Sequence, residues 1–278
     1  MLRYLKHLLF VSAVFTLFSV QILGCKNNVA GNDSASAADT IKAPSGYQLV
    51  WHDEFSGDKV DASKWSYEVN GNGGGNNELQ YYTDLPENSY IENGSLVIQA
   101  LQKDYLGKQY TSARMRTLNK GDWTYGRIEV RAKLPYGQGL WPAIWMLPTD
   151  WEYGGWPASG EIDIMELLGN QTNKIYGTIH YGSSSQDHQQ SGGSFLLPSG
   201  TFAQDYHVFA IDWDSTGITW YVDGIQYFKT AHGKPFDKRF HILLNVAVGG
   251  NWPGDPDQTT RFPQKMYVDY VRVFQKIK

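Results

Sequence analysis

Apolar and polar residues alternate along several short segments of the chain, which is the pattern of β-strands with one buried face. Between residues 126 and 134, charged side chains occupy every second position and apolar ones lie between them. Residues 267–274 are expected to form the last strand. Asp223 and Gly224 separate two such segments and form a strong two-residue hairpin signal. Other strands are expected at residues 95–100, 175–181, 207–213, 219–222, 225–228 and 240–248.

From residue 47 onward, no long segment shows helical periodicity, and loops that contain Gly and Pro separate the strands. Many short strands over ~230 residues predict an all-β fold, built as one large two-sheet antiparallel β-sandwich of the jelly-roll type. The glycine-rich residues 71–75 lack the Lys-Ser/Thr pair of a phosphate-binding loop. We therefore expect a mobile loop at the rim of the domain.

The N-terminal segment has the features of an export signal. Arg3 and Lys6 supply positive charge, and the apolar stretch at residues 8–20 is too short for a membrane-spanning helix of ~20 residues. The following Ile-Leu-Gly-Cys resembles the cleavage box of bacterial lipoproteins. We expect residues 1–24 to be a lipoprotein signal peptide and Cys25 to be lipidated; the alternative is an ordinary signal peptide with a chance cysteine. The protein would then be a bacterial cell-envelope lipoprotein, at the outer membrane or cell surface, or alternatively a secreted protein.

Residues 25–44 are rich in Asn, Ala, Ser and Asp and contain no aromatic residue. Such a segment buries too little apolar surface to fold, so we expect a flexible tether between Cys25 and a folded domain at residues 45–278. Cys25 is the only cysteine, so the domain has no internal disulfide. Net charge is −4 with both signs scattered, which argues against nucleic-acid binding. We expect a monomer that contacts the membrane only through its lipid anchor.

Three acidic residues, Glu161, Asp163 and Glu166, lie within a segment that is otherwise apolar enough for a buried strand. Burying an acidic side chain costs free energy, so such residues usually have hydrogen-bonding or charged partners or a catalytic role. Strict alternation would place Glu166 on the core side and Met165 on the acid side. One extra residue, a β-bulge near Ile164 and Met165, would return all three acids to one face. The alternative is three surface acids on an edge strand.

The two glutamates suit the chemistry of a glycosidase. Their Cα atoms would lie ~13 Å apart at ~3.3 Å per residue, and side chains leaning together over a concave sheet would bring the carboxyl groups to ~5.5 Å. That separation is typical of retaining glycosidases, whereas inverting enzymes need ~6.5–9.5 Å. One glutamate must be ionised to attack the anomeric carbon, and the other must stay protonated through burial and nearby negative charge. Asp163 would hydrogen-bond the nucleophile, and the pattern alone leaves open which glutamate has which role.

The segment Gly-Glu-Ile-Asp-Ile-Met-Glu at residues 160–166 resembles the catalytic signature of glycoside hydrolase family 16, in the E-x-D-x-x-E form of its laminarinase (endo-1,3-β-glucanase) branch. The lichenase branch has the shorter E-x-D-x-E form. The resemblance implies a concanavalin-like jelly roll with a concave substrate groove. It also implies Glu161 as nucleophile, Glu166 as acid/base and Asp163 as assistant, and a catalytic domain at residues 45–278. Further segments resemble the family, in order, at residues 51–55, 76–82, 141–146, 178–181, 248–254 and 268–273.

The activity that the resemblance implies is retaining, endo-acting hydrolysis of laminarin-type β-1,3-glucan. Mixed-linkage β-1,3-1,4-glucan is a further candidate substrate. The ten Trp and 18 Tyr exceed what a core of this size needs, and flat aromatic rings stack on sugars. Trp141, Trp145 and Trp156 flank the acids, and by resemblance they line the subsites before the cleaved bond. The alternative for each is a core tryptophan.

Four more residues are candidates for substrate binding. His180, on the next expected strand, could hydrogen-bond Glu166 or a sugar, or be a core histidine. Arg114 resembles a family position that binds sugar hydroxyls, and the alternative is a surface ion pair. Asn77 and Glu78 lie in a loop that faces the groove by resemblance, with an ordinary turn as the alternative.

No cofactor is expected for catalysis. The resemblance implies a structural Ca²⁺ on the convex side, held by main-chain carbonyls and an aspartate. Glu54, Gly94 and Asp269 match these places, and oxygen ligands suit Ca²⁺. The alternative is that Asp269 only forms a capping hydrogen bond or an ion pair.

Two other classes of function stay open. Agarases, porphyranases and carrageenases also use the E-x-D-x-x-E form, but sulfated polymers call for a basic groove, and few Lys or Arg surround the acids. A non-catalytic glucan-binding lipoprotein could keep the tryptophans but would have no reason to keep all three acids. A purely structural lipoprotein would leave the buried acids unexplained.

Overall fold

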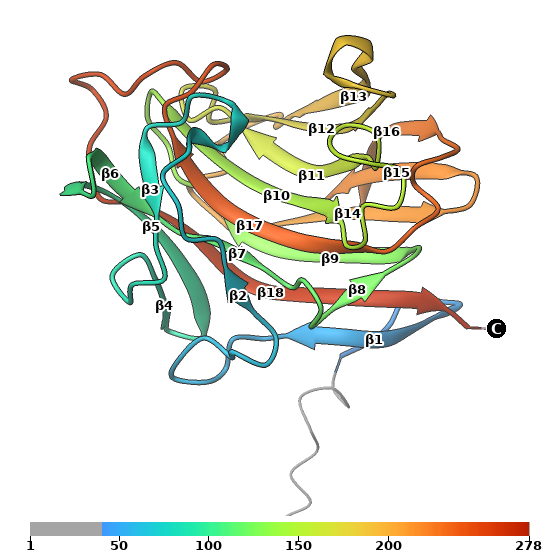
Figure 1. The fold of residues 1–278 in the computed structure, drawn as a ribbon. Helices are drawn as coiled ribbons and strands as arrows, with labels where there is room; N and C mark the ends of the chain where they lie inside the picture. Colours follow the sequence, from blue (N-terminus) through green and yellow to red (C-terminus); the bar gives the residue numbers. More distant parts are fainter. Residues whose placement is uncertain (1–40, 278) are drawn as a thin grey trace, which may run out of the picture. The chain divides into compact units, whose positions relative to one another are not determined.

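The computed structural model describes residues 41–277, which contain two curved β-sheets packed face to face (Figure 1). The strands of the first sheet are β1 (Tyr47–Asp53), β3 (Gln80–Tyr82), β4 (Ser89–Glu92), β5 (Ser95–Tyr105), β6 (Lys108–Ser112), β9 (Gly126–Lys133), β14 (His207–Asp214), β15 (Gly217–Val222), β16 (Ile225–Ala231) and β18 (Gln264–Lys276). Their order is β16-β15-β14-β9-β18-β5-β6-β3, with β1 paired to β18 and β4 to β5.

The second sheet forms the floor of a groove. Its strands are β2 (Ser66–Tyr67), β7 (Arg114–Arg116), β8 (Asp122–Trp123), β10 (Leu140–Pro148), β11 (Glu161–Leu167), β12 (Lys174–Tyr181), β13 (Gln189–Leu196) and β17 (Phe240–Val248). Their order is β13-β12-β11-β10-β17-β7-β2, with β8 paired to β17. Two short 3-10 turns, η1 (Gly73–Gly75) and η2 (Ser185–Asp187), lie in the connections.

Each strand expected from the sequence is present, which confirms the two-sheet sandwich. Among the described strands, one pair departs from the antiparallel pattern: β3 and β6 run parallel over three residues. The β15–β16 hairpin turns at Asp223 (φ 49°) and Gly224 (φ 78°). Both residues are left-handed, as a type I′ turn requires, so the Asp-Gly signal predicted the correct turn.

The hydrophobic core lies between the two sheets. On β9, Ile128, Val130 and Ala132 are fully buried, and the charged residues between them face outward. Burial of each large apolar side chain contributes about 1.5–3 kcal/mol. All nine residues of β17 are buried. One face of this strand packs on the core, and the other presents Asn245 and Ala247 to the groove.

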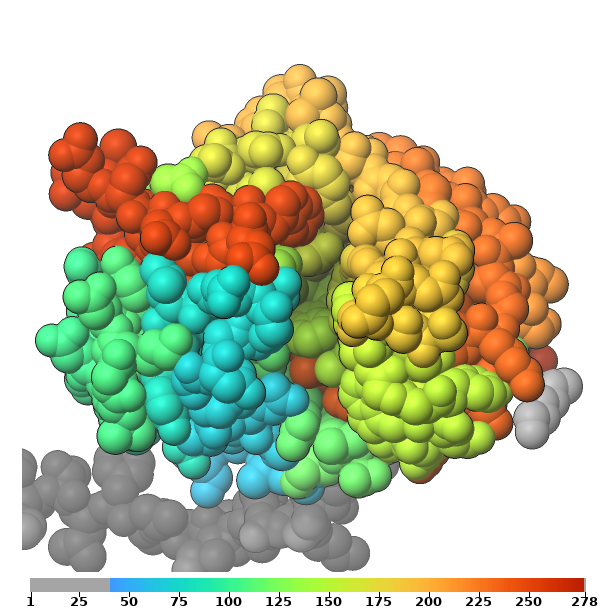
Figure 2. All heavy atoms as spheres, turned by 45° about the horizontal axis from the view of Figure 1, so that its top comes forward, coloured from blue at the N-terminus to red at the C-terminus, as the bar shows by residue number. Residues whose placement is uncertain are grey.

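A groove of about 1230 Å³ crosses the concave face of the second sheet. Figure 2 shows it as a cleft between two walls. Residues 70–78 and Trp252 form one wall, and Trp151, Trp156 and residues 188–194 form the other. The floor comes mainly from β17, β10, β11 and β12, so regular strands position the residues at the bottom of the groove.

Within residues 41–277, no helix is both long and apolar enough to cross a membrane. The expected signal peptide, Cys25 and residues 25–40 of the expected tether lie outside the described residues. Residues 41–44 have no regular secondary structure, and β1 begins at Tyr47. The division into signal, tether and domain stays a prediction.

Candidate active site

Strand β11 contains one extra residue between Asp163 and Glu166. Asp163 pairs with Thr178 and Glu166 pairs with Tyr176, so three steps along β11 match two along β12. The pairing with β10 shifts at the same place. Met165 is fully buried, whereas Glu166 lines the groove. The predicted bulge is therefore confirmed, together with its effect on the acidic face.

The bulge places Glu161, Asp163 and Glu166 together on the floor of the groove. The exposed fractions of their side chains are small: 18% for Glu161, 2% for Asp163, and 9% for Glu166 as a whole residue. Trp156 Nε1 donates to Glu161 Oε2 at 2.9 Å, and Trp141 Nε1 donates to Glu166 Oε1 at 3.0 Å. Each glutamate is thus oriented by an indole that also lines the groove. Contact of these two tryptophans with sugars stays a prediction.

The backbone of β11 is held from the core side at Asp163. Trp220 on β15 donates its Nε1–H to the main-chain oxygen of Asp163 at 2.8 Å. The indole reaches this place because residue 177 on β12 is glycine. A Cβ at Gly177 would lie 2.4 Å from the nearest atom of the Trp220 ring. Core packing therefore fixes the strand at the point where the bulge interrupts its ladder.

The pKa values of all three acids are raised, chiefly by burial. Burial and the charge of Asp163 raise the pKa of Glu161 to about 8, while His180 and the hydrogen bond from Trp156 oppose the rise. Burial raises the pKa of Asp163 to about 8. Burial and the charges of Asp163 and Glu161 raise the pKa of Glu166 well above its usual range. Each acid of the trio therefore binds a proton more readily than a free carboxyl group does.

His180 lies on β12 directly opposite Glu161. Its Nε2 is 3.1 Å from Asp163 Oδ2 and 3.9 Å from Glu161 Oε1. The carboxyl partners of His180 thus differ from the one expected, Glu166, because the strand register sets Tyr176 opposite Glu166. Glu161, Asp163 and His180 each offer a ligand atom within 4.8 Å of the others, a spacing that a metal ion could bridge. Glycoside hydrolysis by two carboxyl groups needs no metal.

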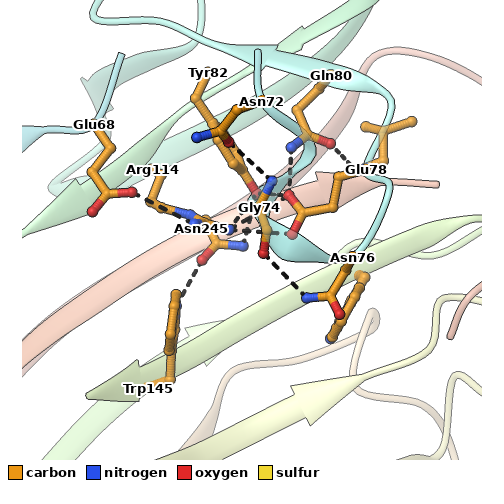
Figure 3. A network of polar contacts seen from close by, with 12 residues as sticks. Glu68, Asn72, Gly74, Asn76, Glu78, Gln80, Tyr82, Arg114, Trp145 and Asn245 are labelled. Carbon is orange, nitrogen blue, oxygen red and sulfur yellow. Dashed lines mark hydrogen bonds and ion pairs between the residues drawn. The ribbon is translucent and has the colours of Figure 1, made fainter. Parts of the chain in front are cut away.

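Arg114 on β7 is the centre of a buried polar network on the other half of the floor (Figure 3). Its Nη2 donates to the Glu78 carboxylate at 3.3 and 3.4 Å, and its Nη1 donates to Glu68 Oε2 at 3.5 Å. The guanidinium lies 4.5 Å from the Tyr82 ring centroid and 5.2 Å from that of Trp145. Arg114 is 9% exposed. The alternative for Arg114 was a surface ion pair; the residue does form ion pairs, but it lies in the groove floor rather than on the outer surface.

The same network orients Trp145, which also lines the groove. Trp145 Nε1 donates to Asn245 Oδ1 at 2.7 Å, and Asn245 Nδ2 donates to the Tyr82 hydroxyl at 3.2 Å. Asn245 is itself buried on β17. The indole is therefore fixed at its N–H edge by a chain of hydrogen bonds that leads back to Arg114.

Glu78 ties the glycine-rich loop to this network. Its carboxylate accepts hydrogen bonds from Gln80 Nε2 at 2.6 Å and from the Tyr82 hydroxyl at 2.9 Å. A Cβ at Gly74 (φ 58°) would lie 2.3 Å from Glu78 Oε1, so only glycine fits at this position. Gly74 and Gly75 line the groove, and the loop forms its rim as predicted.

Asn77 lies in the same loop but outside the groove lining. Its Nδ2 donates to Asn251 Oδ1 at 2.9 Å, which joins two segments of the same wall. The structure thus separates two neighbours that the resemblance grouped together. Glu78 points into the floor, and Asn77 holds the wall.

The groove also contains residues that the sequence analysis does not identify. Tyr176 shares a face with His180 on an alternating strand, and Asn245 is a lone amide in an apolar strand, so both carry a weak signal. His188 and Trp252 lie in connections, where no periodicity marks them. The Trp252 ring lies 5.5 Å from Trp141 and 5.0 Å from Tyr176, centroid to centroid. These rings extend the aromatic lining beyond the three tryptophans that were predicted.

The three residues of the expected calcium site belong to the first sheet and its turns. The Glu54 carboxylate accepts two hydrogen bonds from Arg272, at 2.9 and 2.7 Å, and Asp269 Oδ2 accepts one from Arg131 at 2.6 Å. Asp269 is the extra residue of a bulge in β18 against β9, and Gly94 turns between β4 and β5 with φ 74°. The donors are hard oxygens of the kind that Ca²⁺ prefers, but both carboxylates already have an arginine partner.

Residues 67–272 match the family described as glycosyl hydrolases family 16. The chain belongs to this family. It is 42% identical to the "Beta-glucanase" of Rhodothermus marinus over 95% of each chain. It is 41% identical to "Glucan endo-1,3-beta-glucosidase A1" of Niallia circulans, over 88% of this chain and 40% of that protein. The X-ray structure of the laminarinase from Rhodothermus marinus has a TM-score of 0.79 and 43% identity, covering 84% of this chain and 98% of the other.

Membership of family 16 confirms the resemblance that the acidic signature carried, and with it the glycosidase class of the enzyme. The likeness to a solved family 16 structure confirms the jelly-roll fold. The acidic strand, its bulge and the concave groove are thus the parts of a glycoside hydrolase.

Deletion of Met165 should inactivate this family 16 enzyme. Without the extra residue, Glu166 turns from the groove toward the core, and we expect kcat/KM to fall by at least ~100-fold, the range for loss of a positioned acid/base. Met165→Leu is the matched control: it keeps the residue count and a similar volume, and should retain most activity. Thermal unfolding and circular dichroism verify that both variants fold. Full activity in the deletion variant would contradict the role of the bulge.

Proposed function

We propose that the chain is a retaining endo-1,3-β-glucanase that hydrolyses laminarin-type β-1,3-glucan and also accepts mixed-linkage β-1,3-1,4-glucan. The observation that carries the proposal is the bulged strand β11, which sets Glu161, Asp163 and Glu166 side by side in the middle of the groove. Relatives named β-glucanase and glucan endo-1,3-β-glucosidase support the choice of polymer.

In this proposal Glu161 is the nucleophile and Glu166 is the acid/base. A nucleophile must carry negative charge, and Glu161 has an indole N–H and the His180 ring beside it. An acid must keep a proton at working pH, and burial together with the charges of Asp163 and Glu161 raises the pKa of Glu166 well above its usual range. Glu166 would protonate the leaving oxygen, then take a proton from the water that hydrolyses the glycosyl-enzyme. Asp163 would share a proton with Glu161 and thereby stabilise the negative charge of Glu161.

The shape of the groove favours cleavage within a chain rather than at its end. The lining crosses six neighbouring strands, in the order β13-β12-β11-β10-β17-β7, which span ~24 Å at the usual strand spacing. The acidic strand is the third of these six. Sugar residues would therefore bind on both sides of the trio, as an endo-acting enzyme requires.

The charge of the groove favours a neutral polymer. Among the described residues that line it, Arg114 is the one Lys or Arg, and it is paired with Glu68 and Glu78. With the acidic trio, the groove is acidic, and a sulfated chain of the carrageenan type would be repelled. Aromatic rings along the lining suit the apolar faces of glucose instead.

Substitution of Glu161 tests the function directly. Glu161→Gln keeps the shape but removes the nucleophilic charge, so we expect release of oligosaccharides from laminarin to fall by on the order of 10³-fold or more while laminarin binding persists. The wild-type protein should release short oligosaccharides from laminarin and from mixed-linkage β-glucan, and none from carboxymethyl cellulose or agarose. Proton NMR of the first products should show the β-anomer, as retention requires.

Other outcomes of this experiment have distinct meanings. Release from agarose alone would keep the glutamate pair but replace the substrate with an agar-type polymer. Binding of laminarin without release from any polymer would establish the non-catalytic glucan-binding alternative. Normal hydrolysis by Glu161→Gln would show that another residue is the nucleophile.

We propose further that a structural Ca²⁺ is bound by the main-chain carbonyls of Glu54 and Gly94 and by an Asp269 carboxylate oxygen. Asp269 would exchange its Arg131 partner for the ion. A ligand that binds only the folded state raises stability by mass action, so excess Ca²⁺ should raise Tm relative to EGTA, and Asp269→Ala should remove the difference. Activity at low temperature should be the same in both buffers, since catalysis needs no cofactor. Equal Tm values in Ca²⁺ and EGTA would sink this proposal.

For localisation, we propose export and anchoring through a lipid on Cys25. The support is the apolar stretch, the Ile-Leu-Gly-Cys box and the absence of any other cysteine. Cells fed labelled palmitate should incorporate it into the wild-type protein and not into Cys25→Ser. A wild-type protein that is processed but unlabelled would support an ordinary signal peptide and a secreted enzyme.

A further inference from the structure

We propose that His188 is a positioning residue: it holds His180 in the tautomer that carries its proton on Nε2, the ring nitrogen nearest to the acidic trio. His188 lies in the connection between β12 and β13, on the wall of the groove. No motif of the sequence marks it. The inference rests on the proposed glycosidase function and assigns a task within the same site.

The two histidines are joined through their ring nitrogens. His188 Nε2 lies 2.8 Å from His180 Nδ1. The other ring nitrogen of His180, Nε2, lies 3.1 Å from Asp163 Oδ2 and 3.9 Å from Glu161 Oε1. Both ring nitrogens of His180 therefore have a neighbour: Nε2 lies beside the acids, and Nδ1 contacts His188.

The positions of the protons follow from these contacts. A neutral imidazole has one N–H donor and one acceptor nitrogen, and a carboxylate can only accept. The Nε2 of His180 must then carry the proton, because it faces Asp163 and Glu161. Its Nδ1 is left as an acceptor, and His188 Nε2–H is the donor beside it. With both rings neutral and no proton on Asp163 Oδ2, this arrangement satisfies the contact between the two rings. It also sets an N–H rather than a lone pair 3.1 Å from Asp163 Oδ2, an oxygen that has no other hydrogen-bond partner.

Neighbouring groups keep His188 neutral and in place. Burial and the nearby His180 ring lower the pKa of His188 below its usual value. Asp187 Oδ2 accepts hydrogen bonds from Ser183 N at 3.1 Å and Ser183 Oγ at 2.9 Å, which closes the connection just before His188. The Trp156 ring lies 4.8 Å from the His188 ring, centroid to centroid. The charged groups beside the histidine pair are thus the acids of β11, since the carboxylate of Asp187 is turned to Ser183.

The wrong tautomer of His180 would place a nitrogen lone pair against the lone pairs of Asp163 and Glu161. The support that His180 gives to their negative charge would be lost, and with it part of the stabilisation of the reacting state. His188 lies one ring away from the acids, so its loss should lower kcat and leave KM largely unchanged. A wall residue that only contacts the sugar would mainly change KM instead.

Two substitutions separate the hydrogen bond from the ring. His188→Phe keeps a ring beside Trp156 but has no N–H, and we expect kcat on laminarin to fall about tenfold, the effect of one lost hydrogen bond, with KM within about twofold. His188→Gln has an amide N–H that can reach His180, and should recover at least half of the kcat lost in His188→Phe. An unchanged kcat in His188→Phe, or no recovery of kcat in His188→Gln, would overturn the proposal, as would an effect confined to KM.

The tautomer can also be measured without any substrate. Imidazole ¹⁵N NMR of the full-length protein should show His180 protonated at Nε2 and bare at Nδ1, and a mixture of tautomers in His188→Phe. An Nδ1-protonated His180 in the wild type, or an unchanged His180 in His188→Phe, would refute the inference. Because this measurement needs no hydrolysis, it holds even if the proposed polysaccharide proves wrong, and the two proposals can fail separately.

Discussion

The removal of three carboxyl groups from water within six residues of one strand is the constraint on which the groove depends. A buried carboxylate costs several kcal/mol unless donors and counter-charges replace its hydration. The protein supplies two indole N–H groups, one to each glutamate. The His180 ring lies 3.1 Å from Asp163 Oδ2, an oxygen that accepts no hydrogen bond. What surrounds the acids is therefore polar at the points of contact and aromatic elsewhere. The same indoles that satisfy the acids are those that border the space for a sugar.

The buried acids in the two halves of the groove floor are compensated in different ways. Around β11 three acids lie together, and burial raises the pKa of each of them. Around β7 the acids Glu68 and Glu78 are neutralised by Arg114, which is a fixed ion pair in a buried network. One half of the floor thus contains acids without a Lys or Arg partner, and the other contains a buried ion pair.

The sequence predicts those features that a single strand determines by itself. Alternation gives the strands, and the Asp-Gly pair gives the hairpin turn at residue 223. The bulge follows from a local conflict, because Met165 and Glu166 each suit the face that strict alternation assigns to the other. Family resemblance adds the roles of the two glutamates, which periodicity leaves open.

Features that depend on pairing between distant segments cannot be predicted from the pattern along a single strand. The partner of His180 follows from the register of β11 and β12, which their connection sets and no pattern in either strand reveals. Arg114 meets Glu78 across 36 positions of sequence, so its burial could not be told from a surface ion pair. His188 and Asn77 lie in connections, where side-chain direction depends on turn geometry rather than on a period of two. These are the positions at which the expectations were incomplete.

The hydrogen bond from Trp220 to the Asp163 carbonyl has a broader consequence for how such an enzyme can change. It anchors the acidic strand to the interior, whereas the walls lie nearer the surface: residues 70–78 are a connection, and the opposite wall combines His188 with the edge strand β13. Insertions or exchanges in those walls can alter which polymer fits without moving the reacting carboxyl groups. The fold is in this sense modular: changes in the groove walls can alter the selectivity for a polymer, while the acidic strand stays fixed to the core.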